Sequence, residues 1–146
     1  MVDLVRQAFG GSIDLDPCAP PDPEHHIARR NLVGPTGSAF CGLAAEWNGR
    51  AFVNPPFGDL SEWAAKCRRE HEARHAEIVL LLPSRTDTLY WHDNVSTARA
   101  ICLWKGRMKF IGAKDGAPFP TALVYWGPHP WAFHAVFKPK GMVVIP

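Results

Sequence analysis

The sequence lacks several features that mark common classes of protein. Its four cysteines form no C-x-x-C pair, so the spacing predicts reduced thiols and neither disulfides nor a zinc knuckle. No signal peptide is visible, and the longest aliphatic run, Ile78 to Leu82, is far too short to span a bilayer. Internal repeats and low-complexity tracts are also missing. We therefore expect one cytoplasmic domain over residues 1–146, with no membrane partner.

A strong excess of charge is also missing. Sixteen Lys and Arg residues against fourteen Asp and Glu residues give a net charge of +2, which by itself does not indicate a nucleic-acid partner. The basic residues nevertheless gather in two clusters, namely Lys105, Arg107, Lys109 and Lys114, and Lys66, Arg68, Arg69 and Arg74. Each cluster fits either a patch that follows phosphates or an ordinary solvated face. The hydrophobic fraction of 47% is enough to bury a core.

The order of the expected elements indicates an α/β fold. Helical periodicity covers 2–9 and 60–75, and a further helix is expected from Ser84, with Trp91, Val95 and Ala98 on one face. Strands are expected at 12–16, 51–53, 78–82, 100–104, 121–126, 132–137 and 142–145, with a short segment at 108–111. Residues 18–50 are expected to be mostly loop, with a short helix near 24–30. These elements predict a compact, mostly parallel sheet with an antiparallel C-terminal hairpin.

Asn54, Pro55, Pro56 and Phe57 form the most informative stretch of the chain, directly after the strand 51–53. The Asn54 amide oxygen and the Pro55 carbonyl are two hydrogen-bond acceptors, and neither proline has a backbone N–H that would compete. Phe57 adds a flat aromatic face. Two acceptors beside a ring suit a planar group that carries an NH₂, such as the exocyclic amine of a nucleobase. The plain structural alternative is a proline-rich turn that leads into a helix.

A second pair of candidates, Asp14 and Asp16, also lies at the end of an expected strand. Ligands of open α/β sheets bind beyond the carboxyl ends of the strands, so these carboxylates and Asn54 are predicted to share one site. A carboxylate accepts hydrogen bonds from an ammonium group or from ribose hydroxyls. The alternative is an ordinary strand-end turn before Pro17.

Five segments in a fixed order resemble the small phage-type, Dam-like DNA N6-adenine methyltransferases. These segments are 14–19 (DLDPCA), 47–57 (WNGRAFVNPPF), 82–88 (LPSRTDT), 106–110 (GRMKF) and 117–124 (APFPTALV). The resemblance spans residues 12 to 126. It implies a Rossmann-like methyltransferase sheet without a separate target-recognition domain, in a bacterial or phage-infected cell.

The resemblance also implies the reaction and the residues that carry it. S-adenosylmethionine would be bound by Asp14, Asp16, Pro17 and Ala19, and the methyl group would pass directly to an adenine of a DNA substrate held by Asn54, Pro55, Pro56 and Phe57. No metal is implied. Arg85, Thr86, Arg107 and Lys109 are assigned to DNA contact or pocket lining, or alternatively to plain surface. The rigid segment 118–120 is expected either to border the pocket or to form an ordinary turn.

Other functions stay open at this point. The same motif suits a cytosine amine, an adenine of RNA or a glutamine amide of a protein, and the chain also fits a non-catalytic nucleic-acid-binding remnant. His71-Glu72-Ala73-Arg74-His75 matches the H-E-x-x-H signature of zinc peptidases. However, charged residues flank this segment and no third ligand follows at a known spacing. A charged helix surface is therefore the preferred interpretation, and a solvated loop is preferred for His25-His26.

Overall fold

The computed structural model describes residues 1–35, 41–109 and 114–146 of the chain. Its α-helices are α1 (Val2–Ala8), α2 (Leu60–Arg74), α3 (Leu89–Asp93) and α4 (Pro130–Phe137). Short 3₁₀ turns lie at η1 (Pro23–His25), η2 (Val95–Thr97) and η3 (Lys138–Lys140). The strands are β1 (Leu15–Asp16), β2 (Arg30–Asn31), β3 (Arg50–Val53), β4 (Glu77–Pro83), β5 (Ala100–Trp104), β6 (Thr121–Trp126) and β7 (Gly141–Val144).

Within the described residues these strands form one sheet of seven strands in the order β2-β1-β3-β4-β6-β5-β7. The first four strands pair in parallel, with Val53 beside Leu80. The pairs β4–β6, β6–β5 and β5–β7 are antiparallel. The expected α/β class, parallel in the first half and antiparallel toward the C-terminus, is therefore confirmed. Because β1, β3 and β4 run in the same direction, their carboxyl ends lie at one edge of the sheet.

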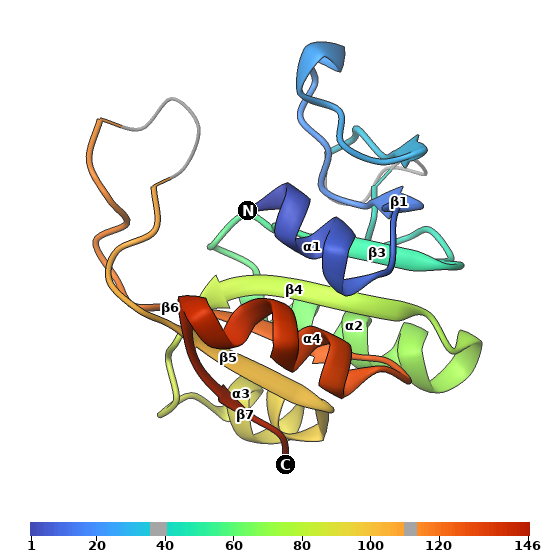
Figure 1. Cartoon of the computed structure of the whole chain (residues 1–146). Coiled ribbons are helices and arrows are strands. Elements are labelled where there is room, and N and C mark those ends of the chain that lie inside the picture. Colours follow the sequence, from blue (N-terminus) through green and yellow to red (C-terminus); the bar gives the residue numbers. More distant parts are fainter. Residues whose placement is uncertain (36–40, 110–113) are drawn as a thin grey trace.

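Helices cover both faces of the sheet, as Figure 1 shows with α1 and α4 in front and α2 and α3 behind. Strand alternation assigns each side chain to one of two cores. Ile78, Leu80 and Leu82 of β4 pack with Trp63 of α2 on one face, among other buried residues. Val79 and Leu81 join the core beneath α1 and α4 on the other face. β4 is buried on both faces because helices cover both, as its continuous aliphatic run predicts.

The segment 132–137 was expected to be a strand, and this prediction is wrong: the chain forms helix α4 there. Pro130 stands at the first helical position, where its missing N–H is not needed. Phe133 and Phe137 are four residues apart, so they share a helix face and pack with ring centroids 4.5 Å apart. Phe133 also stacks on Tyr125 of β6 at 5.1 Å. The last strand, β7, consequently pairs with β5 and not with a preceding hairpin strand.

Smaller differences affect other elements. β1 is only two residues long, and the loop-rich region contributes a parallel edge strand, β2, together with η1 in place of the expected helix near 24–30. The helix expected from Ser84 begins at Leu89 as α3. Of the segment expected at 108–111, residues 110 and 111 lie outside the described residues. In the described part of the chain, no helix is long and apolar enough to cross a membrane.

Candidate active site

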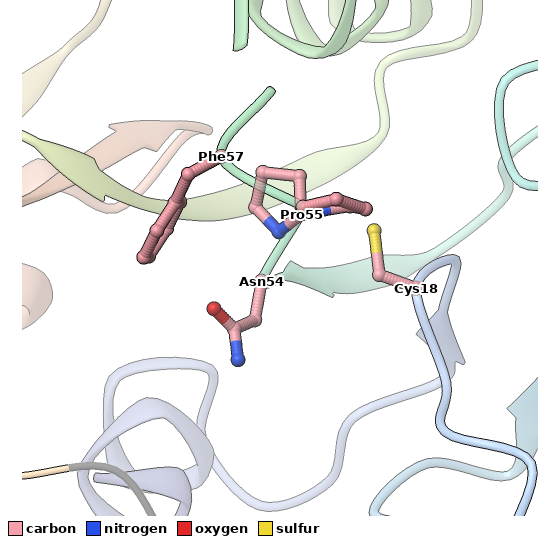
Figure 2. Close-up of a pocket in the computed structure, with 5 residues that line it drawn as sticks. Cys18, Asn54, Pro55 and Phe57 are labelled. Atoms are coloured by element: carbon pink, nitrogen blue, oxygen red, sulfur yellow. The ribbon is translucent and has the colours of Figure 1, made fainter. Parts of the chain in front are cut away.

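The Asn54 to Phe57 stretch leaves the carboxyl end of β3 and walls a cavity of about 330 Å³, together with Cys18. Pro55 is buried and Phe57 is half-buried, whereas Asn54 is exposed. In Figure 2 the Asn54 side chain points away from the proline rings, and the Cys18 sulfur points toward them. Within the described ranges, the side-chain amide of Asn54 forms no hydrogen bond with the protein. The two rigid prolines thus present an uncommitted amide at the mouth of a cavity.

Phe57, which lines this cavity, forms an aromatic pair with Phe119. The rings of Phe57 and Phe119 meet edge to face, with centroids 5.0 Å apart and an interplanar angle of 87°. Phe119 belongs to the segment that precedes β6, and the next carbonyl, Pro120 O, accepts the N–H of Ser84 at 2.9 Å. Phe119 thus contacts a residue of the cavity wall, but none of residues 118–120 lines the three cavities described here, so both interpretations of this segment stay open.

Asp16 lies at the end of β1 and is only 5% exposed. One of its carboxylate oxygens accepts the N–H of Cys18 at 2.9 Å. Burial raises the pKa of Asp16 to about 6, against the opposing effects of the Cys18 N–H and His26. Its side chain faces a cavity of about 340 Å³ that Asn54 and Lys109 also line. The second carboxylate oxygen, which has no partner in the described structure, can accept a hydrogen bond from a group in this cavity.

Cys18 lies where the cavities adjoin. It lines the cavity of Asn54 and Phe57, the cavity of Asp16, and a third cavity of about 140 Å³. Pro17, Ala19, Pro56 and Trp63 are among the residues of this third cavity. Burial raises the pKa of the Cys18 thiol far above its usual range, so the thiol stays protonated. Of the expected cofactor residues, Asp16, Pro17 and Ala19 are therefore all brought beside the Asn54 motif.

Asp14 is placed differently from Asp16. Its carboxylate accepts the Arg50 backbone N–H at 2.9 Å and the Arg50 Nε–H at 3.1 Å. Partial burial raises the pKa of Asp14, but the hydrogen bonds and charge of Arg50, with a smaller contribution from Arg29, outweigh that effect and hold the pKa below its usual value. Asp14 lines none of the three cavities. The structure thus gives Asp14 a partner within the protein and leaves Asp16 facing the cavity.

The four residues assigned to DNA contact lie on two different connections of the chain. Arg85 and Thr86 are exposed in the loop after β4, and neither lines a cavity described above. Arg107 and Lys109 are exposed on the long connection between β5 and β6. Lys109 also lines the Asp16 cavity. Their proximity to the site therefore differs, although all four follow the carboxyl ends of strands.

The H-E-x-x-H segment is the C-terminal end of α2. His71 Nδ1 lies 2.9 Å from the Ala76 carbonyl oxygen, and Glu72 pairs with Arg68 at 2.7 Å. His75 is the C-cap residue, exposed and left-handed with φ of 56°. Among the described residues, no group of three His, Cys, Asp or Glu side chains is arranged to hold a metal ion. The residues of this motif thus take part in local contacts at a helix end.

Several cavity residues were not assigned from the sequence. The sequence predicts no role for Cys18, although it lies within the segment 14–19, and it predicts a solvated loop for His25. Both line the Asp16 cavity, as do Val2 of α1 and Met108. Cys18 had a usable signal, since it lies two residues beyond Asp16 at a strand end. No local sequence signal indicated His25, because its position at the cavity depends on the path of the loop that contains η1.

The fold and these cavities define an α/β protein with a ligand site at the carboxyl edge of its parallel strands. Comparison with known families then identifies which one: residues 2–122 match the family described as DNA N-6-adenine-methyltransferase (Dam), and the chain belongs to this family. No curated protein matches the chain. The family resemblance is confirmed, and it supports DNA adenine N6-methyltransferase activity in general.

Proposed function

We propose that the protein methylates the exocyclic N6 amine of adenine in DNA, with S-adenosylmethionine as the methyl donor. One observation carries this proposal: Asn54 and Cys18 are the two residues shared by the 330 Å³ cavity of the Asn-Pro-Pro-Phe motif and the 340 Å³ cavity of Asp16. Methyl transfer needs a donor site and an acceptor site that meet at one point. Here they meet at the residue best suited to hold an amine.

The residues on the Asp16 side fit the cofactor. Asp16 supplies a buried carboxylate whose second oxygen has no hydrogen-bond partner in the described part of the protein, and it suits the ammonium group or the ribose hydroxyls of the cofactor. Pro17 and Ala19 extend the wall into the adjoining 140 Å³ cavity, where the apolar Leu32 and Trp63 also lie. Bound S-adenosylmethionine supplies an electrophilic methyl group on a sulfonium. The protein's task is to orient the amine toward it.

Asn54 and Pro55 orient and activate the amine. The lone pair of an adenine amine is delocalised into the ring, which makes the nitrogen a poor nucleophile. When the Asn54 amide oxygen and the Pro55 carbonyl accept its two N–H groups, they favour a pyramidal nitrogen and stabilise the positive charge that develops on it. Because neither proline offers an N–H, nothing in this wall competes for the lone pair. The rigid backbone fixes the acceptors in place before the base arrives.

Phe57 and Phe119 form the part of the site that receives the base. A base within a duplex cannot reach Asn54, so it has to be flipped out of the stack. Phe57 is the half-buried aromatic residue of this cavity on which the base would stack, and the Phe119 ring meets it edge to face with centroids 5.0 Å apart. Base–aromatic stacking contributes about 1–3 kcal/mol per base. Family membership favours adenine in DNA over cytosine, RNA adenine or a glutamine amide, all of which the same motif suits.

A transfer assay with single-group substrates tests the proposal. The purified chain is incubated with methyl-labelled S-adenosylmethionine and duplexes that contain adenine, or hypoxanthine in its place. Hypoxanthine carries a carbonyl oxygen at C6 in place of the N6 amine, so it offers no amine to methylate. We expect label only in the adenine duplexes, recovered as N6-methyladenine. Equal label in the hypoxanthine duplexes, in cytosine or in an RNA of the same sequence would contradict the proposed acceptor.

A further inference from the structure

The connection between β5 and β6 carries a concentration of unpaired positive charge. We call its described residues, 105–109 and 114–120, the basic arm. Figure 1 shows these described residues standing away from the sheet beside the carboxyl ends of β3 and β4. Four cationic residues on it are exposed: Lys105, Arg107, Lys109 and Lys114. None of them forms a salt bridge with a described acidic residue, unlike Arg50, Lys66, Arg68 and Arg74.

The two segments of the arm, 105–109 and 114–120, contact each other. Ala117 N–H donates to the Met108 carbonyl at 2.7 Å. A side chain at Gly116 would meet the Arg107 Cβ at 2.7 Å, so a glycine is required for this close approach. Met108 is buried while Arg107 and Lys109 on either side of it are exposed. The alternation turns the apolar residue toward the protein and the cations outward.

The base of the arm belongs to the site. Met108 and Lys109 line the Asp16 cavity, and Phe119 packs against Phe57 of the motif. A polymer that delivers a base to Asn54 would therefore reach a site at which Lys109 of the arm also lies. A nucleic-acid backbone is a polyanion with regularly spaced phosphates, and exposed Lys and Arg side chains without acidic partners are the groups that replace its counterions.

We infer that the basic arm is the surface that holds the DNA backbone while a base occupies the motif cavity. The inference rests on the proposed function, because DNA as the occupant follows from it. Contacts to phosphates fix position and carry no direct sequence information. The arm is thus expected to strengthen binding to all duplexes alike, which suits a chain in which no separate recognition domain is expected.

The salt dependence of DNA binding tests this inference. Anisotropy of a labelled duplex is followed without cofactor between about 50 and 200 mM salt for the wild type, for Arg107→Gln/Lys114→Gln and for a triple variant that adds Lys105→Gln. The slope of log K against log salt should fall by about 2 in the double variant and about 3 in the triple variant. The loss should be the same for duplexes of different sequence.

A matched control removes two exposed cations elsewhere. Arg69→Gln/Arg99→Gln has the same change of charge, with Arg69 on α2 and Arg99 directly before the amino end of β5. This control should keep the wild-type slope. Unfolding midpoints of all variants are compared, and Lys114→Gln alone, with an expected change of about 1, serves if the others are unstable.

Three outcomes would decide the matter against the arm: an unchanged slope in the triple variant, an equal change in the control, or tighter binding to RNA than to DNA. The proposed function can fail separately. If the wild type binds DNA with an arm-dependent slope but transfers no methyl group, the methyltransferase proposal is wrong and the arm stands. If methyl transfer occurs and the salt slope is unchanged in the arm variants, the methyltransferase proposal stands and the role of the arm is wrong.

Discussion

Asp14 directly precedes β1 and Asp16 is its last residue, and the two carboxylates have opposite surroundings. The Asp14 carboxylate accepts three hydrogen bonds from Arg50, at 2.9, 3.1 and 3.4 Å, and its pKa is lowered by that partner despite partial burial. Asp16 is buried, with its pKa raised to about 6 by burial, and faces a cavity. Asp14 thus forms ion pairs with Arg50 and Arg29, whereas Asp16 forms no ion pair with a described Lys or Arg.

The same contrast separates two regions of the molecule. Between α2 and the loop before β3, Glu70 is buried and fully paired: it accepts from Lys66 at 2.6 Å and from the Trp47 N–H at 2.9 Å, and it pairs with Arg74 at 3.1 Å. At the carboxyl edge, Asn54 and one oxygen of Asp16 lack such partners in the described structure. Paired polar groups hold the fold together, whereas polar groups left open at a cavity are available to a ligand.

The paired region is tested by Glu70→Ala. Loss of this carboxylate leaves the buried Lys66 ammonium and the Trp47 N–H without their partner, which should lower the free energy of unfolding by about 3–5 kcal/mol in urea titrations. The matched control is Glu72→Ala, which breaks an i,i+4 pair with Arg68 whose Glu side chain is 55% exposed. That change should cost no more than about 1 kcal/mol. Equal losses would show that the buried network contributes no more than a surface pair.

The carboxyl edge of the sheet is tested by Asn54→Ala, which should lower activity and leave stability nearly unchanged. Removal of one preorganised hydrogen-bonding group typically lowers kcat by about 100- to 1000-fold, and we expect a loss of this size. Because the protein itself makes no hydrogen bond to this amide in the described structure, the unfolding midpoint and cofactor affinity should stay nearly unchanged. Asn48→Ala, at an exposed asparagine outside the cavities, is the control. Wild-type kcat in Asn54→Ala would refute the assigned role.

How far the sequence predicts this contrast depends on the range of the interactions. Local patterns predicted helix α2, the buried strand β4 and the motif at the end of β3. They also placed Asp16 correctly at a strand end. They could not predict that Arg50, which is 36 residues from Asp14, takes up that carboxylate. The contact exists only once β1 and β3 are paired.

The wrong strand at 132–137 has a different cause. Its run of aromatic and apolar residues fits both periods over so short a length, and only Pro130 and the Phe133–Phe137 spacing indicate a helix. Tertiary packing of Phe133 on Tyr125 then decides between the two. Short apolar segments are therefore ambiguous in isolation, whereas long periodic ones such as α2 are not.

The aromatic border of the cavity is tested by Phe57→Ala, with a smaller expected effect. Loss of a stacking face should cost about 1–3 kcal/mol in kcat/KM for DNA. Phe119→Ala should cost less, and because the two rings touch, the double variant should show a coupling of about 0.5–1.5 kcal/mol. Kinetics with one duplex across the four proteins measure the cycle. Strict additivity would mean that Phe119 does not support Phe57.

The last prediction returns to the two aspartates and uses pH to distinguish them. Since the pKa of Asp16 is about 6, its carboxylate is mostly protonated at pH 5 and mostly ionised at pH 7. If the ionised form binds the cofactor, affinity for S-adenosylmethionine should rise about tenfold over this range. Asp16→Asn should remove that dependence and weaken binding at pH 7.

The contribution of Asp16 to the stability of the fold should decrease as pH rises, whereas its contribution to cofactor binding should increase. A carboxyl whose pKa is raised by folding stabilises the fold below its unfolded pKa, and this contribution is lost as pH rises toward 6. Asp16→Asn should therefore raise the unfolding temperature at pH 7 while it weakens cofactor binding. Asp14→Asn should lower the unfolding temperature at pH 7, because its lowered pKa stabilises the fold above the ordinary value, and should leave cofactor affinity intact. Calorimetric titration and thermal unfolding of both variants measure the two effects, and weaker cofactor binding in Asp14→Asn alone would exchange the roles of the two carboxylates.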